Sequence, residues 1–326
     1  MFTGKTVLIT GGTGSFGKNF TKYILETQNP KKVAVFSRDE FKQYEMAKEI
    51  KDSRLRFLIG DVRDLPRLQR ALNGVDIVVH AAALKQVPAL EYNPFEAVKT
   101  NILGSQNVVD AALDQKVSKV LLVSTDKAVQ PINLYGATKL AAEKLFIAAN
   151  AYATKQTLLS AVRYGNVVAS RGSIIEHLIK NGGAEKVQIT HPEMTRFWLT
   201  LEESFKLVMF AMKNMEGGEI FIPQIPTLKI GDLFDVLAPK AKKEIIGLRP
   251  GEKMHEILLT QDEARHGFAL DNYFVILPQL ILRENMYQKY LKKGKKLSPK
   301  FQFTSDIKNI RLTKNKFREK IKASLL

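Results

Sequence analysis

The sequence predicts an α/β protein, with a Rossmann-type doubly wound parallel sheet and a smaller C-terminal lobe. Apolar runs alternate with helical patterns through the first half of the chain, and a glycine-rich turn joins the first run to the first helix. The length of 326 residues exceeds what one simple core usually needs. We expect residues 1–165 to form the sheet domain, to which later segments return, and residues 166–326 to form mainly the second lobe.

The first predicted strand, residues 6–10, leads directly into a glycine turn and a helix. The turn has the spacing Gly-x-x-Gly-x-x-Gly, which allows the backbone to approach a pyrophosphate closely and lets the helix pack against the strand. The helix N-terminus then faces the negative charge. The pattern predicts a dinucleotide site whose contacts are Gly11, Thr13, Gly14, Ser15, Phe16 and Gly17.

The second predicted strand, residues 32–36, indicates which dinucleotide binds. NAD enzymes usually place an acidic residue at this strand end, where it accepts from the ribose 2′-hydroxyl, but this chain has Arg38. A guanidinium favours a 2′-phosphate. We therefore predict NADP, held by Ser37, Arg38 and Lys42, while Asp39 leaves NAD open.

The third and fourth predicted strands, residues 55–60 and 75–80, also end in residues suited to a dinucleotide. Asp61, followed by Val62, can accept a hydrogen bond from adenine. Small residues after the fourth strand, Ala81, Ala82 and Ala83, let the cofactor lie against the backbone. We interpret His80 as a packed residue and not as a catalyst.

The fifth predicted strand, residues 119–124, precedes the stretch that carries the chemistry. Ligands of such sheets bind at the carboxyl ends of strands. On the following helix, Tyr135 and Lys139 stand at i and i+4, so they share one face and the ammonium is expected to lower the pKa of the phenol. Such a pair alone is often only a surface contact, but its position here favours catalysis.

Composition excludes several classes of function. The chain has no cysteine, which rules out disulfides and thiolate chemistry, and we predict no metal site. It lacks an apolar run long enough to span a bilayer and a signal peptide, so we expect a soluble cytoplasmic protein. The net charge of +17 raises the alternative of nucleic-acid or anionic-membrane binding, but no nucleic-acid motif accompanies it. We expect neither partner.

Several segments together resemble the extended short-chain dehydrogenase/reductases. Within that family, the chain is similar to the inverting UDP-N-acetylglucosamine 4,6-dehydratases, which begin pseudaminic acid synthesis. The resemblance covers nearly the whole chain and weakens towards the C-terminus; Gln86 stands where the family commonly has histidine. The segments that carry it are residues 11–17, 37–40, 60–64, 81–85, 131–139, 163–167 and 249–253.

The resemblance implies an NADP-dependent hydro-lyase whose cofactor stays tightly bound and is regenerated in each turnover. In the implied mechanism, Tyr135 takes the C4 hydroxyl proton, Lys139 stabilises the phenolate and Thr125 holds the C4 oxygen. Lys127 removes the C5 proton and Asp126 protonates the departing C6 hydroxyl. Hydride leaves C4 and returns to C6, so C6 becomes a methyl group.

The resemblance also implies a UDP-N-acetylglucosamine substrate, a substrate-binding C-terminal lobe and a homo-oligomer. Thr100 joins the expected cofactor contacts. We interpret residues 197–199 and 205–210 as core. The expected substrate contacts are Lys85, Asn166, Val167, Arg171, Arg196, Arg249 and Glu252.

Three alternatives remain open from the sequence. A retaining dehydratase would differ in stereochemistry at C5. A UDP-sugar 4-epimerase would need Thr125, Tyr135 and Lys139 but would have no use for the Asp-Lys pair at 126 and 127. An NADP-binding regulatory protein would need no catalytic residue at all.

Overall fold

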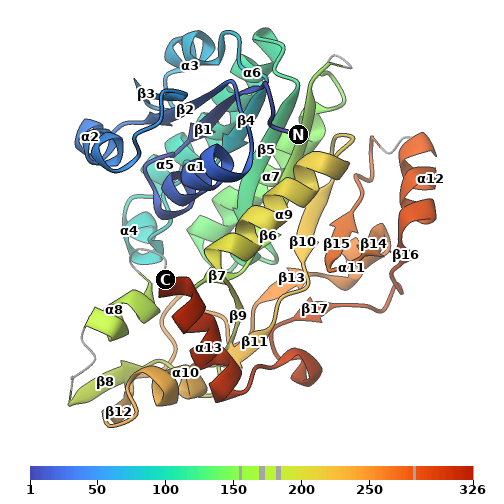
Figure 1. Cartoon of the computed structure of the whole chain (residues 1–326). Coiled ribbons are helices and arrows are strands. Elements are labelled where there is room, and N and C mark those ends of the chain that lie inside the picture. The colour runs from blue at the N-terminus through green and yellow to red at the C-terminus, as the bar shows by residue number, and fades with distance from the viewer. Residues whose placement is uncertain (154–155, 169–172, 181–184, 282–283, 326) are drawn as a thin grey trace.

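The computed structural model describes residues 1–153, 156–168, 173–180, 185–281 and 284–325 (Figure 1). One ten-stranded sheet runs through the molecule. Its strands lie in the order β16 (Lys295–Lys296), β14 (Gly267–Leu270), β15 (Tyr273–Ile276), β10 (Ile220–Pro223), β6 (Leu158–Tyr164), β5 (Lys119–Thr125), β4 (Ile77–His80), β1 (Thr6–Thr10), β2 (Lys32–Ser37) and β3 (Leu55–Ile59).

The seven strands from β3 to β10 pair in parallel, which confirms the predicted doubly wound sheet. All five residues of β1 are buried, as expected for a central strand covered on both faces. The chain first builds outward from β1 through β2 to β3 and then continues on the other side of β1 with β4. This reversal of strand order creates the crevice in which such sheets bind ligands.

Helices cover both faces of the sheet (Figure 1). On one face α1 (Ser15–Thr27) packs against α9 (Leu201–Asn214), with the rings of Phe16 and Phe205 5.7 Å apart. Asp39 caps the helix that follows it, Glu40–Glu49, through a hydrogen bond from the Lys42 amide. The other elements that connect the parallel strands are α2 (Glu40–Glu49), α3 (Leu65–Leu72), α4 (Val87–Tyr92), α5 (Pro94–Ala97), the π-helical turn η1 (Val98–Leu103), α6 (Gly104–Asp114), the 3-10 turn η2 (Asp126–Ala128) and α7 (Leu134–Ala149).

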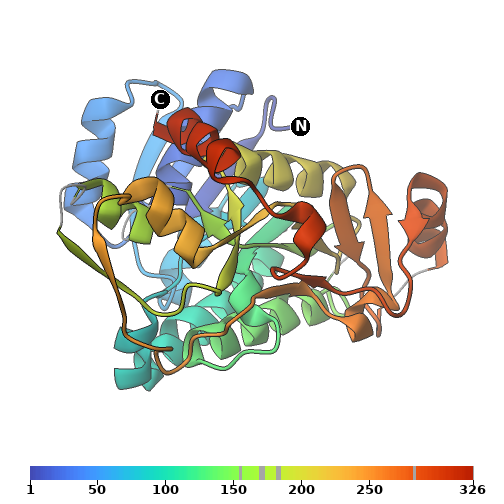
Figure 2. The same cartoon turned by 90° about the horizontal axis from the view of Figure 1, so that it is seen from below.

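A second lobe lies beyond the carboxyl ends of the parallel strands (Figure 2). It has its own apolar core, in which Trp198 packs edge-on against Phe317 at 5.6 Å. Its short strands pair as β11 (Thr227–Lys229), β9 (Thr195–Leu199) and β7 (Asn166–Val167); β12 (Lys242–Ile245) with β8 (Lys186–Ile189); and β13 (Ile257–Leu259) with β17 (Phe303–Thr304). The remaining helices of the C-terminal half are α8 (Ile174–Lys180), α10 (Ile230–Leu237), α11 (Gln261–Ala264), α12 (Glu284–Lys293), η3 (Lys308–Ile310) and α13 (Lys314–Leu325).

The C-terminal half also contributes to the large sheet. β10 pairs in parallel with β6, and β15, β14 and β16 extend this edge in antiparallel fashion. Segments after residue 165 therefore lie in both parts of the molecule, and the division into residues 1–165 and 166–326 stays a proposal. Among the described helices, none is long and apolar enough to cross a membrane.

Candidate active site

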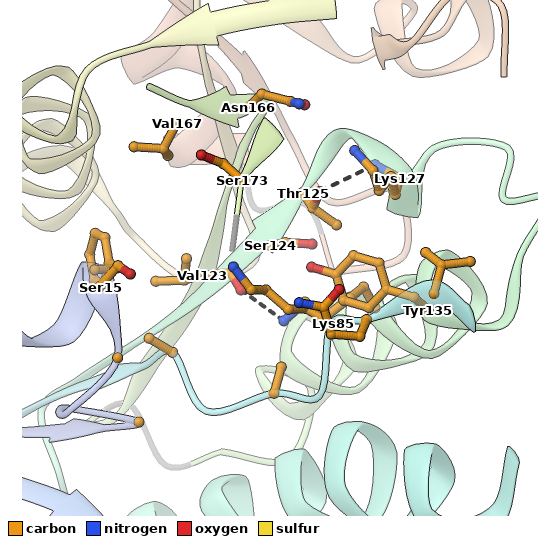
Figure 3. Close-up of a pocket in the computed structure, with 18 of the residues that line it drawn as sticks. Ser15, Lys85, Val123, Ser124, Thr125, Lys127, Tyr135, Asn166, Val167 and Ser173 are labelled. Atoms are coloured by element: carbon orange, nitrogen blue, oxygen red, sulfur yellow. Dashed lines mark hydrogen bonds between the residues drawn. The ribbon is translucent and has the colours of Figure 1, made fainter. Parts of the chain in front are cut away.

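A cavity of about 780 Å³ opens at the carboxyl ends of the parallel strands, between the sheet and the second lobe. In Figure 3, Ser124 and Thr125 at the end of β5 lie close to Tyr135 of α7. The cavity brings together residues that the sequence places far apart. The predicted site residues that line it are Gly11, Thr13, Gly14, Ser15, Phe16, Gly17, Ser37, Arg38, Lys42, Asp61, Val62, Ala81, Ala82, Ala83, Lys85, Thr100, Thr125, Lys127, Tyr135, Lys139, Asn166, Val167, Arg196, Arg249 and Glu252.

One described residue of the predicted site, Asp126, does not line the cavity. It is fully buried, and it forms hydrogen bonds with the cavity residues Lys127 and Thr125. Arg171, a predicted substrate contact, lies outside the described residues.

The glycine loop has the shape that a bound dinucleotide requires. Gly11 has a φ of +64°, and a Cβ atom there would stand 2.8 Å from the backbone of Ala82. At Gly17 a Cβ would lie 2.5 Å from the Cα of Gly12. The N-cap of α1 is Gly14, which has no side chain to cap the helix, and Gly14, Ser15 and Phe16 line the cavity, so the N-terminus of α1 lies at the cavity wall.

Buried hydroxyls in the cavity wall also fit a ligand. Thr100 Oγ1 and Ser124 Oγ are buried and have no hydrogen-bond partner among the described residues. Unpaired buried polar atoms are uncommon in proteins, because each loses its hydration without compensation. Both hydroxyls lie where a polar cofactor or substrate would supply the missing hydrogen bonds.

The end of β2 shows how the ribose of the adenosine half would be recognised. Asp39, which kept NAD open, has both carboxylate oxygens engaged: Oδ1 accepts from the Lys42 amide at 2.9 Å, and Oδ2 pairs with Lys42 Nζ at 2.7 Å. Asp61 is likewise held by Arg63. Arg38 is half exposed at the cavity edge, 3.8 Å from Asp61. Both carboxylates near the end of β2 are thus engaged by other residues, and the half-exposed guanidinium of Arg38 is the charged group best placed to meet a ribose substituent.

Tyr135 and Lys139 share one face of α7, as predicted, but their electrostatics differ from the expectation. The Lys139 ammonium donates to the Val123 carbonyl at 2.8 Å. Burial raises the pKa of the Tyr135 phenol, although Lys127 and the Thr125 hydroxyl partly offset this effect. Burial lowers the pKa of Lys139 to about 8, against the opposing charge of Glu143. The expected lowering of the phenol pKa by Lys139 is wrong for this structure, since the ammonium is directed to backbone.

Lys127 lies between two buried carboxylates. Its Nζ is 3.0 Å from Asp126 Oδ1 and 3.6 Å from Glu256 Oε1. Burial opposes the charged amine, but the two carboxylates outweigh burial and raise the pKa of Lys127 above its ordinary value. Thr125 completes the turn, because its hydroxyl donates to the same Asp126 oxygen at 3.0 Å. Hydrogen bonds therefore join the side chains of Lys127, Asp126 and Thr125 into one connected set.

The segment after Arg249 holds the catalytic turn in place from the opposite side. Asn133, the N-cap of α7, donates to the Gly251 carbonyl at 2.8 Å. The Lys253 ammonium donates to the Val129 carbonyl at 2.6 Å, just after η2. Residues 249–256 therefore connect the predicted substrate contacts to the acid–base residues.

Sequence reasoning missed several residues of the site. Glu256 has only one sequence signal, its place three residues after the Arg-Pro-Gly-Glu-Lys segment. Trp198, interpreted as core, is indeed buried but also lines the cavity. The prediction for His80 is confirmed: it is fully buried between the hydroxyls of Thr10 and Ser105.

The comparisons with known proteins agree with this arrangement. Residues 7–278 match the polysaccharide biosynthesis protein family. A protein of Campylobacter jejuni named UDP-N-acetylglucosamine 4,6-dehydratase (inverting) is 49% identical over 94% of each chain. A protein of Rickettsia prowazekii named UDP-glucose 4-epimerase is 43% identical, over 91% of this chain and 89% of its own.

A solved structure shares the whole fold. The X-ray structure of Pen from Bacillus thuringiensis superimposes with a TM-score of 0.91 and 39% identity, and the match covers 100% of this chain and 99% of that one. The doubly wound parallel sheet, the glycine loop and the Tyr135–Lys139 pair on one helix are those that the sequence predicted. The chain is thus an extended short-chain dehydrogenase/reductase and belongs to the polysaccharide biosynthesis protein family.

Proposed function

We propose that this protein is an inverting UDP-N-acetylglucosamine 4,6-dehydratase that carries out the first step of pseudaminic acid synthesis. The observation that carries the proposal is the position of Lys127, which lines the same cavity as Tyr135 and Thr125. Its Nζ contacts the buried Asp126 at 3.0 Å. The name of the Campylobacter jejuni relative supports the substrate and the stereochemistry. The product would be the 4-keto-6-deoxy sugar nucleotide, inverted at C5.

NADP is the proposed cofactor. The glycine loop and the first turn of α1 would hold its pyrophosphate, and Ser37 and Arg38 would hold the 2′-phosphate. When bound, it supplies a hydride acceptor for C4 and a hydride donor for C6. The engagement of Asp39 by Lys42 supports NADP over NAD.

Tyr135 and its neighbours would handle the C4 hydroxyl. The phenolate oxygen of Tyr135 accepts that proton, while the Thr125 hydroxyl orients the C4 oxygen by a hydrogen bond. Lys139, whose pKa lies at about 8, exchanges its proton readily near neutral pH, and its ammonium would have to turn from the Val123 carbonyl to supply positive charge beside the phenolate. Once C4 is a ketone, the proton at C5 becomes acidic.

Asp126 and Lys127 would carry out the elimination. Moving one proton from Lys127 Nζ to Asp126 Oδ1 converts the ion pair into an amine and a carboxylic acid. The amine then takes the C5 proton, and the C5–H electron pair moves into the enolate of the C4 ketone. As the electron pair returns to form the C5–C6 double bond, the C6–O bond breaks. The buried Asp126 gives its proton to the hydroxyl of Thr125, which passes its own proton to the departing hydroxyl in the cavity. The pair ends as carboxylate and ammonium, and water is the leaving group.

A 4-epimerase is the second candidate, because the Rickettsia prowazekii relative carries that name. An epimerase oxidises and reduces C4 and has no use for an acid–base pair beside C5. The position of Lys127 between two carboxylates favours the dehydratase. A homo-oligomer and a cytoplasmic location stay predictions.

Proton NMR with UDP-N-acetylglucosamine and substoichiometric NADP in heavy water tests the proposal. The dehydratase gives a new C6 methyl signal, deuterium at C5 and ring couplings changed by inversion, whereas an epimerase leaves the C6 methylene and changes C4. Lys127→Ala is expected to abolish the methyl signal, and Lys206→Ala, in an exposed ion pair on α9, serves as the matched control. Full turnover by Lys127→Ala would contradict the proposed elimination.

A further inference from the structure

Glu256 is a buried carboxylate in the cavity wall, and the reaction described above gives it no part. Only 3% of its surface is exposed. Its Oε1 lies 3.6 Å from Lys127 Nζ and 3.8 Å from Arg196 Nε, and its Oε2 has no hydrogen-bond partner among the described residues. A buried carboxylate costs solvation free energy, and here the two cations compensate only one of its oxygens.

Other buried glutamates of the chain are satisfied differently. Glu219 is fully buried, and each of its oxygens accepts two hydrogen bonds, from backbone amides and from the hydroxyls of Ser160 and Tyr290. Glu143 is held by two nitrogens of the Arg163 guanidinium. These two carboxylates stabilise the fold. Glu256 differs because its charge is directed at the cavity and at Lys127.

The backbone of Glu256 is fixed by a chain of buried polar contacts. Its amide donates to Ser305 Oγ at 2.8 Å, and the Ser305 amide donates to the Glu256 carbonyl at 2.8 Å. Ser305 Oγ in turn lies 2.7 Å from Thr195 Oγ1, which lies 2.8 Å from His255 Nδ1. Three segments of the second lobe thus meet at this residue and leave its backbone little freedom.

Lys127 needs such a partner for geometric reasons. It stands on the short turn η2, and its side chain has four rotatable bonds, so the contact with its sequence neighbour Asp126 fixes one direction only. The carboxylate of Glu256, which comes from a distant segment, is a second contact that restricts where Nζ lies. The lysine still faces the cavity, because 27% of its side chain is exposed.

We propose that Glu256 is a positioning residue for the elimination step, which holds Lys127 Nζ towards C5 and helps to keep the proton on it until C4 has been oxidised. This inference rests on the proposed dehydratase function. The charged groups that face Lys127 are Asp126, Glu256, Arg196 and Lys253, and Tyr135 is the neutral titratable group beside it. Removing Glu256 leaves Asp126 as the single anion of the set.

Two substitutions separate charge from position. Glu256→Gln keeps the shape of the side chain and removes a charge that raises the pKa of Lys127. The acidic limb of the turnover–pH profile, which we assign to Lys127, is therefore expected to move to lower pH by about one unit. Glu256→Asp keeps the charge but withdraws it, so the limb stays and turnover falls about tenfold or more. In both variants, reduction of the cofactor by substrate, followed by its absorbance after rapid mixing, is expected to keep its rate. Deuterium incorporation at C5 slows in Glu256→Asp.

Glu193→Gln is the matched control, because Glu193 pairs with Lys229 on the surface and does not face Lys127. An acidic limb that Glu256→Gln leaves in place, or a C4 oxidation that slows as much as the elimination, would overturn the inference. Thermal unfolding of each variant identifies a folding defect, which would lower both half-reactions together.

A second readout does not depend on turnover. In the wild-type protein and in Glu256→Gln, the rate at which Lys127 reacts with an amine-selective acylating reagent is measured by mass spectrometry, with Lys206 of the same digest as internal reference. The variant is expected to react about tenfold faster at neutral pH, because a larger fraction of Lys127 is then the free amine. Equal rates would overturn the inference. If the wild-type protein forms no C6 methyl group, the proposed function fails and with it the role in elimination, while the labelling result still decides whether Glu256 holds the proton on Lys127.

Discussion

The ion pair between Arg163 of β6 and Glu143 of α7 is expected to be a principal support of the catalytic helix. Both side chains are 1% exposed, and their two hydrogen bonds measure 3.1 and 2.6 Å. Arg163 also binds the Leu258 carbonyl and Glu263. Because Glu143 lies one helical turn after Lys139, this pair fixes the face of α7 that carries the catalytic lysine.

We predict that Arg163→Met destabilises the protein by about 3–5 kcal/mol, since it leaves Glu143 buried and unpaired. For a chain of 326 residues, about 4 kcal/mol corresponds to a fall in Tm of roughly 6 °C. Glu143→Leu combined with Arg163→Met is expected to recover at least half of the loss, because the double variant no longer contains the fully buried carboxylate, and the Glu263 carboxylate that also loses its partner is 25% exposed. Urea-induced and thermal unfolding measure both quantities.

Lys206→Met is the control for this experiment. It breaks an exposed i,i+4 ion pair with Glu202, which is expected to cost only about 0.3–0.5 kcal/mol. The reasoning is refuted if Arg163→Met is within about 1 kcal/mol of wild type, or if the double variant loses the sum of the two single effects.

Three further predictions concern the cofactor half of the site. Burial depresses the pKa of Lys139 from 10.5 to about 8, so the protonated lysine destabilises the folded state below pH 8, and this penalty disappears as pH rises to 10.5. In urea unfolding without cofactor, Lys139→Met should therefore be more stable than wild type at neutral pH, and the difference in unfolding free energy should narrow above pH 8. Gly17→Ala should weaken NADP binding more than tenfold in calorimetry, because its Cβ would meet the backbone of Gly12 at 2.5 Å; unchanged affinity would contradict the close fit of the loop. Arg38→Ser should reduce the preference for NADP over NAD about tenfold or more, measured as the ratio of the two Kd values, and an unchanged ratio would assign the 2′-phosphate to other residues.

Local sequence patterns were sufficient to predict the parallel strands β1 to β5 of the sheet. The first strand is Thr6–Thr10, as predicted, and the fifth, Lys119–Thr125, ends one residue later than expected. Runs of buried apolar residues bounded by turn residues depend on near neighbours, so they can be read from the chain alone. The short antiparallel strands β14, β15 and β16 carry no comparable signal, because their pairing depends on an edge supplied by β10.

Contacts between distant segments were less predictable. The sequence placed Tyr135 and Lys139 on one helix face, but it did not show that Val123 accepts the lysine's hydrogen bond. Nor did it show that Glu256 reaches Lys127, which requires the second lobe to fold back over η2. Arg163 appeared only as part of a family motif, whereas its role as a buried ion-pair centre comes from packing.

The return of the chain to the large sheet bears on how the protein could be divided. A fragment that ended at residue 165 would leave β6 as an open edge, with the amides and carbonyls that normally pair with β10 unsatisfied. Open apolar edges recruit other strands, so such a fragment would be prone to aggregate. A soluble half would need residues 220–223 and 267–276 restored beside it, which makes a circular permutant a better starting point for dissection than a simple truncation.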